Sequence, residues 1–308
     1  MHQTPPLPLD ASLPALLAIA RRGLGPVLAE AGVGEPTNPV VVLKYHPEKR
    51  CTFLAKTNGR VLVVKLFRES PSLLARLFER LAEEGLATGH APTVAPMAAF
   101  APHLCLIANE WLDGRPLGEL IGGGSARRAG EIAGEWLLRS PGSRISLGEP
   151  YGPEALLKDA GRWTRALTNF DAGIGESAAK TVQALRSGVP RSVRYGLVHG
   201  SFYPSHVLDL GGGPGVIDWD NFTQASIGLD AGMFCAWVSD LALAGWCLPH
   251  QAEEAQTAFL GLISGLVPED DLRWHRSIAL IKLAKYVAKY RREGWLGHAT
   301  ALLAAATF

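Results

Sequence analysis

YGLVHGSFYPSHVLDLGGGPGVIDWDNFTQASIGLDAGM, residues 195–233, says more about the architecture of this chain than any other segment. Its apolar runs predict a short strand, a polar loop, a β-hairpin over 206–219 and then a helix. The glycine-rich run 211–215 joins the two hairpin strands, so we interpret it as a turn and not as a phosphate-binding loop. The second strand is expected to end at an acidic pair, Asp218 and Asp220.

The composition is that of an ordinary globular protein of 308 residues, with 47% apolar residues, 19% charged residues and a net charge of +1. This balance gives no reason to expect binding to nucleic acid or to an anionic membrane. The four cysteines form no CxxC pair, and no signal peptide is apparent, which favours a cytoplasmic protein with reduced thiols. Asp230 and Asp240 interrupt the apolar segment 227–249, so we expect a buried helix there.

The first half of the chain predicts a small antiparallel sheet. Helical periodicity covers 10–32, with Asp10 or Ser12 as a candidate cap. Apolar and β-branched residues predict strands at 39–45, 51–57 and 61–67, and Asn58-Gly59 is typical of a two-residue hairpin turn. A helix over 71–87 and strands at 97–101 and 104–112 follow.

Beyond Asp113 the sequence changes character and reads mainly as helices, apart from the hairpin. The last long helix is expected at 271–294, ended by Gly294. The pattern therefore predicts an α+β, two-lobed protein. Its parts are an N-terminal helical extension (1–37), a small antiparallel β-lobe (38–112) and a larger, mostly helical lobe (113–308).

Lys65 alternates with apolar neighbours in the third strand, so it can point into a cleft while they face the core. There it would pair with nucleotide phosphates and with a helix glutamate, for which Glu79 is our choice over Glu83 and Glu84. The alternative is a lysine in solvent at the sheet edge. The turn at 46–50 contains no glycine, and Lys49 and Arg50 either contact phosphates by charge or lie in a plain exposed turn.

The second set of candidates surrounds the hairpin. Asp218 ends a hydrophobic strand and offers the hard oxygen ligand that magnesium prefers. Asp220 shares that face only if the chain stays extended, and turn capping is its alternative role. We expect His199 to pack beneath the loop and bond to backbone, and Asp230 to accept hydrogen bonds from backbone amides of the same loop.

Three motifs carry a resemblance: HGSFYPSHVL–hairpin–VIDWD, VVVLKYHPEKRCTFL and NEWLDGRPL. Over roughly residues 38–300 the chain resembles the phosphotransferase enzyme family, which includes aminoglycoside, choline and homoserine kinases and has a bilobal protein-kinase-like fold. The resemblance implies ATP and Mg²⁺ as cofactors, a small-molecule hydroxyl as substrate, and residues 38–112 as the nucleotide-binding lobe. It implies Lys65 as the phosphate lysine, Asp218 as the metal ligand, Asp230 as the support of the loop, and adenine near the backbone of Glu110 to Leu112.

Two positions depart from the family pattern. Ser201 stands in the place of the catalytic aspartate, and His206 in the place of the metal-binding asparagine. Serine accepts no proton at neutral pH, and loss of a general base costs about 10²–10⁴ in rate. Imidazole suits magnesium poorly.

By their positions in the family pattern, Ser201 and Asp218 are the candidate catalytic residues, and Asp218 and His206 are the candidate metal ligands. Three functions stay open: an atypical or impaired phosphotransferase, a pseudokinase that binds nucleotide or a protein partner, and an enzyme that transfers a nucleotidyl group.

Overall fold

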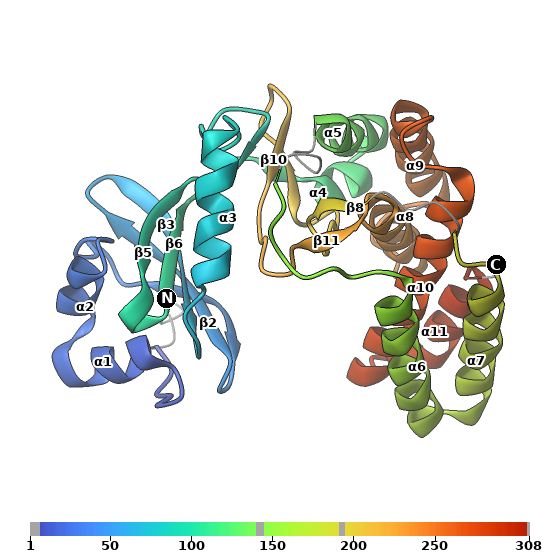
Figure 1. Ribbon diagram of the computed structural model, residues 1–308, viewed down its shortest axis with the longest axis horizontal. Coiled ribbons are helices and arrows are strands. Elements are labelled where there is room, and N and C mark those ends of the chain that lie inside the picture. The colour runs from blue at the N-terminus through green and yellow to red at the C-terminus, as the bar shows by residue number, and fades with distance from the viewer. Residues whose placement is uncertain (1–6, 140–144, 191–194, 307–308) are drawn as a thin grey trace. The chain divides into compact units, whose positions relative to one another are not determined.

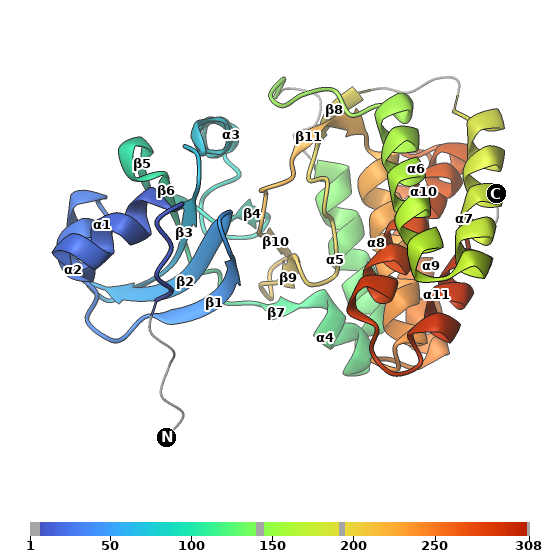
Figure 2. The same ribbon diagram turned by 90° about the horizontal axis from the view of Figure 1, so that it is seen from below.

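The computed structural model describes residues 7–139, 145–190 and 195–306, which form two compact units, Met1–Asp113 and Gly114–Phe308. Figure 1 and Figure 2 show the elements of each unit. The first six residues of the predicted extension 1–37 lie outside the described residues. An antiparallel sheet in one unit and a mostly helical second unit confirm the predicted α+β class.

A five-stranded sheet of order β1-β2-β3-β6-β5 forms the centre of the first unit. Its neighbouring strands all pair antiparallel. The strands are β1 (Val41–His46), β2 (Arg50–Thr57), β3 (Arg60–Phe67), β5 (Met97–Ala101) and β6 (Leu106–Glu110), and the two-residue strand β4 is Thr93–Val94. The meander and its Asn58-Gly59 turn therefore lie where the sequence predicts them.

One face of this sheet is buried under two N-terminal helices, α1 (Pro14–Arg22) and α2 (Leu24–Glu30). Leu62, Val64 and Leu66 of β3 point into that core. Strand alternation then places Val63 and Lys65 on the opposite face. Helix α3 (Ser72–Glu83) lies on the side of the sheet away from α1 and α2 (Figure 1).

The helical periodicity over 10–32 corresponds to two helices, because the chain breaks at Gly23, whose φ of 89° no helix accommodates. The predicted cap is wrong: Leu13 precedes α1 and makes no side-chain cap bond. Asp10 instead accepts hydrogen bonds from the Tyr45 hydroxyl (3.0 Å) and the Glu48 amide (2.8 Å). It therefore ties the N-terminal segment to the β1–β2 turn.

The predicted strand 104–112 is too long at both ends. A 3₁₀ turn, Pro102–Leu104, and the left-handed residue Cys105 (φ 50°) delay the start of β6 to Leu106. The strand ends at Glu110, although the Trp111 amide still donates to the Val61 carbonyl (2.9 Å). Proline and the left-handed residue together explain the late start.

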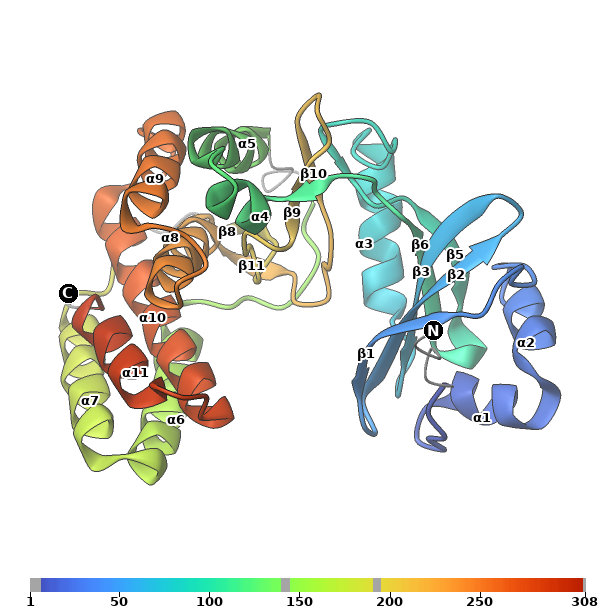
Figure 3. The same ribbon diagram turned by 180° about the vertical axis from the view of Figure 1, so that it is seen from behind.

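The second unit is built on helices. They are α4 (Leu117–Gly122), α5 (Ala126–Arg139), α6 (Pro153–Phe170), α7 (Ala172–Ser187), α8 (Gly228–Leu243), α9 (Pro249–Ile263), α10 (Glu269–Tyr290) and α11 (Trp295–Ala304). Side chains of α6, α7, α8, α10 and α11 share one core, and Figure 3 shows α10 alongside α8 and α11. No helix among the described residues is long and apolar enough to cross a bilayer.

The last long helix ends earlier than predicted. Helix α10 stops at Tyr290, because Arg291 adopts a left-handed conformation (φ 43°). Gly294, predicted as the terminator, is instead the residue before α11. The four cysteines are buried free thiols, as predicted.

Short strands complete the second unit. β9 (Val207–Asp209) and β10 (Pro214–Val216) form the predicted hairpin, and β7 (Arg115–Pro116) pairs with β9. β8 (Tyr195–Val198) pairs antiparallel with β11 (Thr223–Ser226). The loop between β8 and β9 is thus fixed at both ends by strand pairing. Because residues 199–206 include the candidate catalytic residue Ser201, we call them the catalytic loop.

Candidate functional site

Asp230, in the first turn of α8, holds the start of the catalytic loop. Its carboxylate oxygens accept hydrogen bonds from the backbone amides of His199 (2.7 Å) and Gly200 (2.9 Å). The side chain is 2% exposed, and burial raises its pKa to about 7, although the two amide bonds oppose that shift. Gly200 is required here, because its φ is 70° and a Cβ would lie 2.1 Å from the Asn221 carbonyl oxygen.

The His199 imidazole is fully buried beneath the loop. Its Nε2 lies 2.9 Å from the Ile217 carbonyl oxygen, which can only accept, so Nε2 carries the proton. Nδ1 is then an acceptor, and the Ser201 hydroxyl lies 3.2 Å from it. The ring also packs edge-on against Trp219, with 4.7 Å between centroids. His199 therefore connects the loop to the chain that follows the hairpin.

Ser201 is 1% exposed, and its hydroxyl is engaged inside the loop. Because Nδ1 of His199 accepts, the serine oxygen donates its proton to that nitrogen. The Asn221 side-chain amide approaches the same oxygen at 3.5 Å. A hydroxyl held in this way is a donor to protein and offers no base to an acceptor molecule.

His206 and Asp218 lie side by side at the hairpin. Nδ1 of His206 is 2.9 Å from the Ser201 carbonyl oxygen, so Nδ1 donates and Nε2 remains without a proton in the neutral ring. Nε2 lies 3.6 Å from a carboxylate oxygen of Asp218. The two side chains are 20% and 28% exposed, so both are accessible from solvent.

Asp218 does not end a strand, which corrects the sequence interpretation. Strand β10 stops at Val216, and Asp218 adopts a left-handed conformation with φ of 64°. Asp220 follows in a turn, so the two carboxylates do not lie along one extended face. Among the described residues, no group of three or more histidines, cysteines and carboxylates is placed to hold a metal ion.

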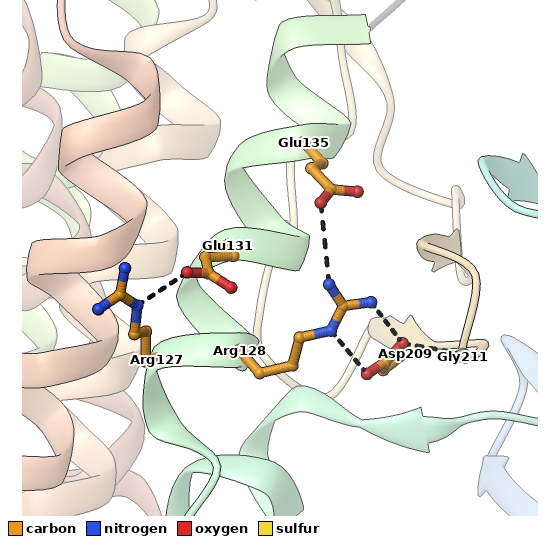
Figure 4. Close-up of polar contacts among 6 residues, drawn as sticks. All are labelled: Arg127, Arg128, Glu131, Glu135, Asp209 and Gly211. Carbon is orange, nitrogen blue, oxygen red and sulfur yellow. Dashed lines mark hydrogen bonds and ion pairs between the residues drawn. The ribbon is translucent and has the colours of Figure 1, made fainter.

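The hairpin that precedes Asp218 is anchored to α5 by an arginine (Figure 4). Arg128 donates from Nε and Nη2 to the two carboxylate oxygens of Asp209, at 3.2 and 3.3 Å. Asp209 also accepts from the Gly211 amide at 2.9 Å, at the beginning of the turn. Arg127, one residue earlier, instead pairs with Glu131 on the same helix. The turn 211–215 is therefore held by a side chain as well as by the strand ladder.

The predicted nucleotide residues all belong to the first unit. Lys65 lies opposite Thr52 of β2 and Ile107 of β6 in the sheet register. Glu79 is exposed on α3 and forms no hydrogen bond or ion pair with any described residue, so the structure does not join it to Lys65. Lys49 is exposed in the β1–β2 turn.

Three further predicted residues lie at strand ends. Arg50, the first residue of β2, is partly buried and stands opposite His46 in the register. The Glu110 side chain is 3.4 Å from Arg60, and its amide donates to the Pro96 carbonyl (2.8 Å). Leu112 is 7% exposed. Whether these residues meet a nucleotide stays a prediction.

A cavity of about 400 Å³ opens next to the catalytic loop, wholly within the second unit. Gly200, Asn221 and Phe222 line it from the loop side, and Asp159 of α6 and Lys282 of α10 line it from the helices. None of these five residues is among the site residues predicted from the sequence. Lys282 follows the loop by some eighty positions in a long helix, and no motif distinguishes it from its neighbours.

A profile of the phosphotransferase enzyme family matches residues 48–265. Among solved structures, the fold is similar to a choline kinase from Streptococcus pneumoniae (13% identity, 88% of this chain and 94% of that one, TM-score 0.60). It is also similar to an amicoumacin kinase in complex with AMP-PNP and Ca²⁺ (16% identity, 94% and 95%, TM-score 0.63) and to an aminoglycoside-3'-phosphotransferase of type VIII (17%, 79% and 93%, 0.54). The search of curated proteins found no significant match.

Proposed function

This chain belongs to the phosphotransferase enzyme family, and on that premise we propose that it binds ATP and transfers the γ-phosphoryl group to a small-molecule hydroxyl by an atypical or impaired mechanism. The observation that carries this proposal is the loop support: Asp230 accepts the amides of His199 and Gly200 at 2.7 and 2.9 Å. Because burial of a carboxyl group is unfavourable, its use to hold the backbone of this loop indicates that the loop conformation is important for function. Phosphoryl transfer depends mainly on positioning and on charge neutralisation, which a fixed loop serves.

The metal expected for such a reaction is only partly matched by the residues present. Asp218 offers the oxygen that both Mg²⁺ and Mn²⁺ prefer, whereas Nε2 of His206 is a nitrogen ligand that Mn²⁺ accepts more readily than Mg²⁺ does. These two side chains would hold the ion, which when bound would neutralise phosphate charge. Protonation of His206 would instead place an imidazolium against Asp218 and compete with a cation for that carboxylate.

Within this proposal the loop residues have distinct tasks. Ser201 keeps His199 in one tautomer by donating to Nδ1, and His199 in turn donates to the Ile217 carbonyl. That bond ties the loop to the residue just before Asp218. The chain therefore positions Asp218 through backbone contacts, and no general base stands at position 201 to take the acceptor's proton.

A second candidate, a pseudokinase, is favoured by the same two replacements. Ser201 is buried and donates, and His206 faces Asp218 at 3.6 Å, so neither residue supplies the chemistry expected at its position. A nucleotide-binding regulatory module would require the fold and the phosphate lysine, but no turnover.

Thermal unfolding with AMP-PNP, in Mg²⁺, Mn²⁺ or EDTA, tests nucleotide binding. A ligand at about 100 times its Kd stabilises the protein by about 2.7 kcal/mol. We expect this gain in the wild type with a divalent cation, and its loss in Lys65→Met and Asp218→Asn. Lys56→Met is the matched control, because Lys56 is an exposed lysine of the neighbouring strand β2. Absence of stabilisation in every metal contradicts both the phosphotransferase and a pseudokinase that binds nucleotide.

Turnover then separates the two candidates. Phosphate transfer from ATP to a panel of hydroxyl compounds, followed by mass spectrometry, identifies an active phosphotransferase and distinguishes a phosphoryl from a nucleotidyl adduct. A pseudokinase binds AMP-PNP, transfers nothing, and gains turnover in the double variant Ser201→Asp, His206→Asn. Faster turnover by the wild type than by that double variant rejects the pseudokinase.

A further inference from the structure

The cavity beside the catalytic loop combines apolar walls with one unusual cation. Trp163, Phe222, Met233 and Ile278 supply apolar and aromatic surface, and Gly200 brings the catalytic loop to its edge. A volume of about 400 Å³ lies within the range of small-molecule sites. Its position next to the loop makes it the natural place for the molecule that receives the phosphoryl group.

Lys282 reaches this cavity from α10 and is partly buried. Its ammonium donates to the Tyr203 hydroxyl at 3.1 Å and lies 5.7 and 5.9 Å from the centres of the Tyr203 and Trp237 rings. Those two rings stack on each other with 3.9 Å between centroids. The aromatic pair therefore fixes the lysine in place and partly compensates its charge.

No carboxylate among the described residues forms an ion pair with Lys282. An ammonium has three donors, and one goes to Tyr203. Burial lowers the pKa of Lys282 to about 8, and the charge of Lys285 adds to that effect. The lysine still carries a proton at neutral pH, with donors available to a ligand.

The carboxylate of Asp159 also lines the cavity, but it already has two hydrogen-bond partners. It accepts a hydrogen bond from the Tyr151 hydroxyl (2.7 Å) and a second from the Arg162 guanidinium. The charge of Asp159 also acts on Lys282 and raises the pKa of that lysine, although no ion pair joins the two side chains. Because Arg162 shares Asp159, the group of Asp159, Arg162 and Lys282 carries a net positive charge.

We propose that this cavity binds an acceptor that carries an oxyanion, with Lys282 as the group that recognises it. This inference rests on the proposed phosphotransferase function and adds the charge class of the substrate. The ligand is a small hydroxyl compound with a carboxylate or phosphate group on an apolar or aromatic body. The oxyanion accepts from Nζ of Lys282, and the apolar body packs on Trp163 and Phe222.

Three probes of similar size and different charge test the charge class. They are 3-phenyllactate (anion), phenylalaninol (cation) and 3-phenyl-1,2-propanediol (neutral), each with a hydroxyl, and calorimetry at pH 7 without nucleotide measures their Kd. We expect the wild type to bind 3-phenyllactate at least about 10-fold more tightly than either other probe, as one charge-assisted hydrogen bond provides. Phenyl phosphate in the same assay distinguishes a phosphate ligand from a carboxylate ligand.

Two variants connect the preference to one lysine. Lys282→Met keeps the length of the side chain and removes the charge, and we expect it to bind the three probes within about 3-fold of one another. Lys289→Met is the matched control, because Lys289 is exposed on the same helix and does not line the cavity. It should keep the wild-type preference. Melting temperatures of both variants show whether each one folds.

Several outcomes overturn the inference. They are equal or better binding of phenylalaninol by the wild type, an anion preference that survives in a folded Lys282→Met variant, and no binding of either anion up to about 10 mM. AMP-PNP binding is measured in parallel. Loss of AMP-PNP affinity in Lys282→Met, with unchanged binding of 3-phenyllactate, assigns the lysine to the nucleotide. Failure of the wild type to bind AMP-PNP rejects the proposed function instead, so the two failures differ.

Discussion

Replacing Ser201 by alanine isolates the role of its hydroxyl. In the folded chain that hydroxyl donates to Nδ1 of His199 at 3.2 Å, and both residues are at most 1% exposed. Alanine removes the donor and leaves Nδ1 as a buried acceptor without its partner. The proton of His199 cannot move to Nδ1 without cost, because Nε2 then no longer donates to the Ile217 carbonyl at 2.9 Å.

The magnitude follows from this geometry. A buried polar group that loses its partner costs about 1–3 kcal/mol, and the alanine fills nearly the same volume, so no cavity adds to that cost. For a domain of this size, 1 kcal/mol corresponds to about 2–4 °C in melting temperature. We therefore expect Ser201→Ala to melt about 2–12 °C below the wild type.

Urea unfolding and thermal melts of the wild type and two variants measure the effect. Ser205→Ala is the matched control, because Ser205 is an exposed serine of the same loop, and we expect a change below about 0.5 kcal/mol. If Ser201→Ala is as stable as Ser205→Ala, the reasoning about the buried donor is wrong. If it keeps full stability but abolishes turnover, Ser201 takes part in chemistry.

Three further predictions concern the same loop and hairpin. Burial raises the pKa of Asp230 from 3.8 to about 7, so the stability that the protonated group provides at low pH is lost as the pH rises from 4 to 7. Over that range the free energy of unfolding of the wild type, measured in urea, should fall by up to about 4 kcal/mol relative to that of Asp230→Asn. Equal pH dependence of the free energy of unfolding in the two proteins contradicts this. Arg128→Met leaves Asp209 without its arginine and should cost about 1–2 kcal/mol in urea unfolding, against under about 0.5 kcal/mol for Arg127→Met. Gly200→Ala places a Cβ 2.1 Å from a carbonyl oxygen and should abolish soluble expression or cost over about 3 kcal/mol, whereas Gly211→Ala, with nothing within 4 Å, should cost only about 1–2 kcal/mol from its positive φ.

The fold was well predicted where it depends on neighbouring residues, as in strands and tight turns. Alternation in 61–67 and the Asn58-Gly59 turn fix β3 and its register with β2, because side chains must alternate across the sheet. Helix ends were less predictable. Arg291 ends α10 in a left-handed conformation that arginine rarely adopts, and Gly294, the residue that pattern favours, serves the next helix.

In the candidate site, too, some residues could be predicted from a motif and others could not. The positions of His199 and Asp230 follow from a motif, and the structure brings them together. The left-handed Asp218 did not follow, because an aspartate after a β-branched strand reads as extended. Lys282 did not follow either: its approach to Tyr203 joins residues 79 positions apart, which only tertiary packing determines.

Ser201 and His206, the two positions where the sequence is expected to depart from the family pattern, are physically coupled. Ser201 donates through its hydroxyl to His199 and accepts through its carbonyl from His206 at 2.9 Å, so both replacements share one network. An aspartate alone at position 201 would meet the Nδ1 lone pair of His199, and its charge would favour protonation of both nearby imidazoles. A protonated His206 would then hold Asp218 more tightly and oppose a cation there. Asparagine at position 206 removes that competitor. We therefore expect Ser201→Asp to give a higher Mn²⁺-dependent nucleotide affinity in the His206→Asn background than in the wild type. A double-mutant cycle on that affinity measures the departure from additivity.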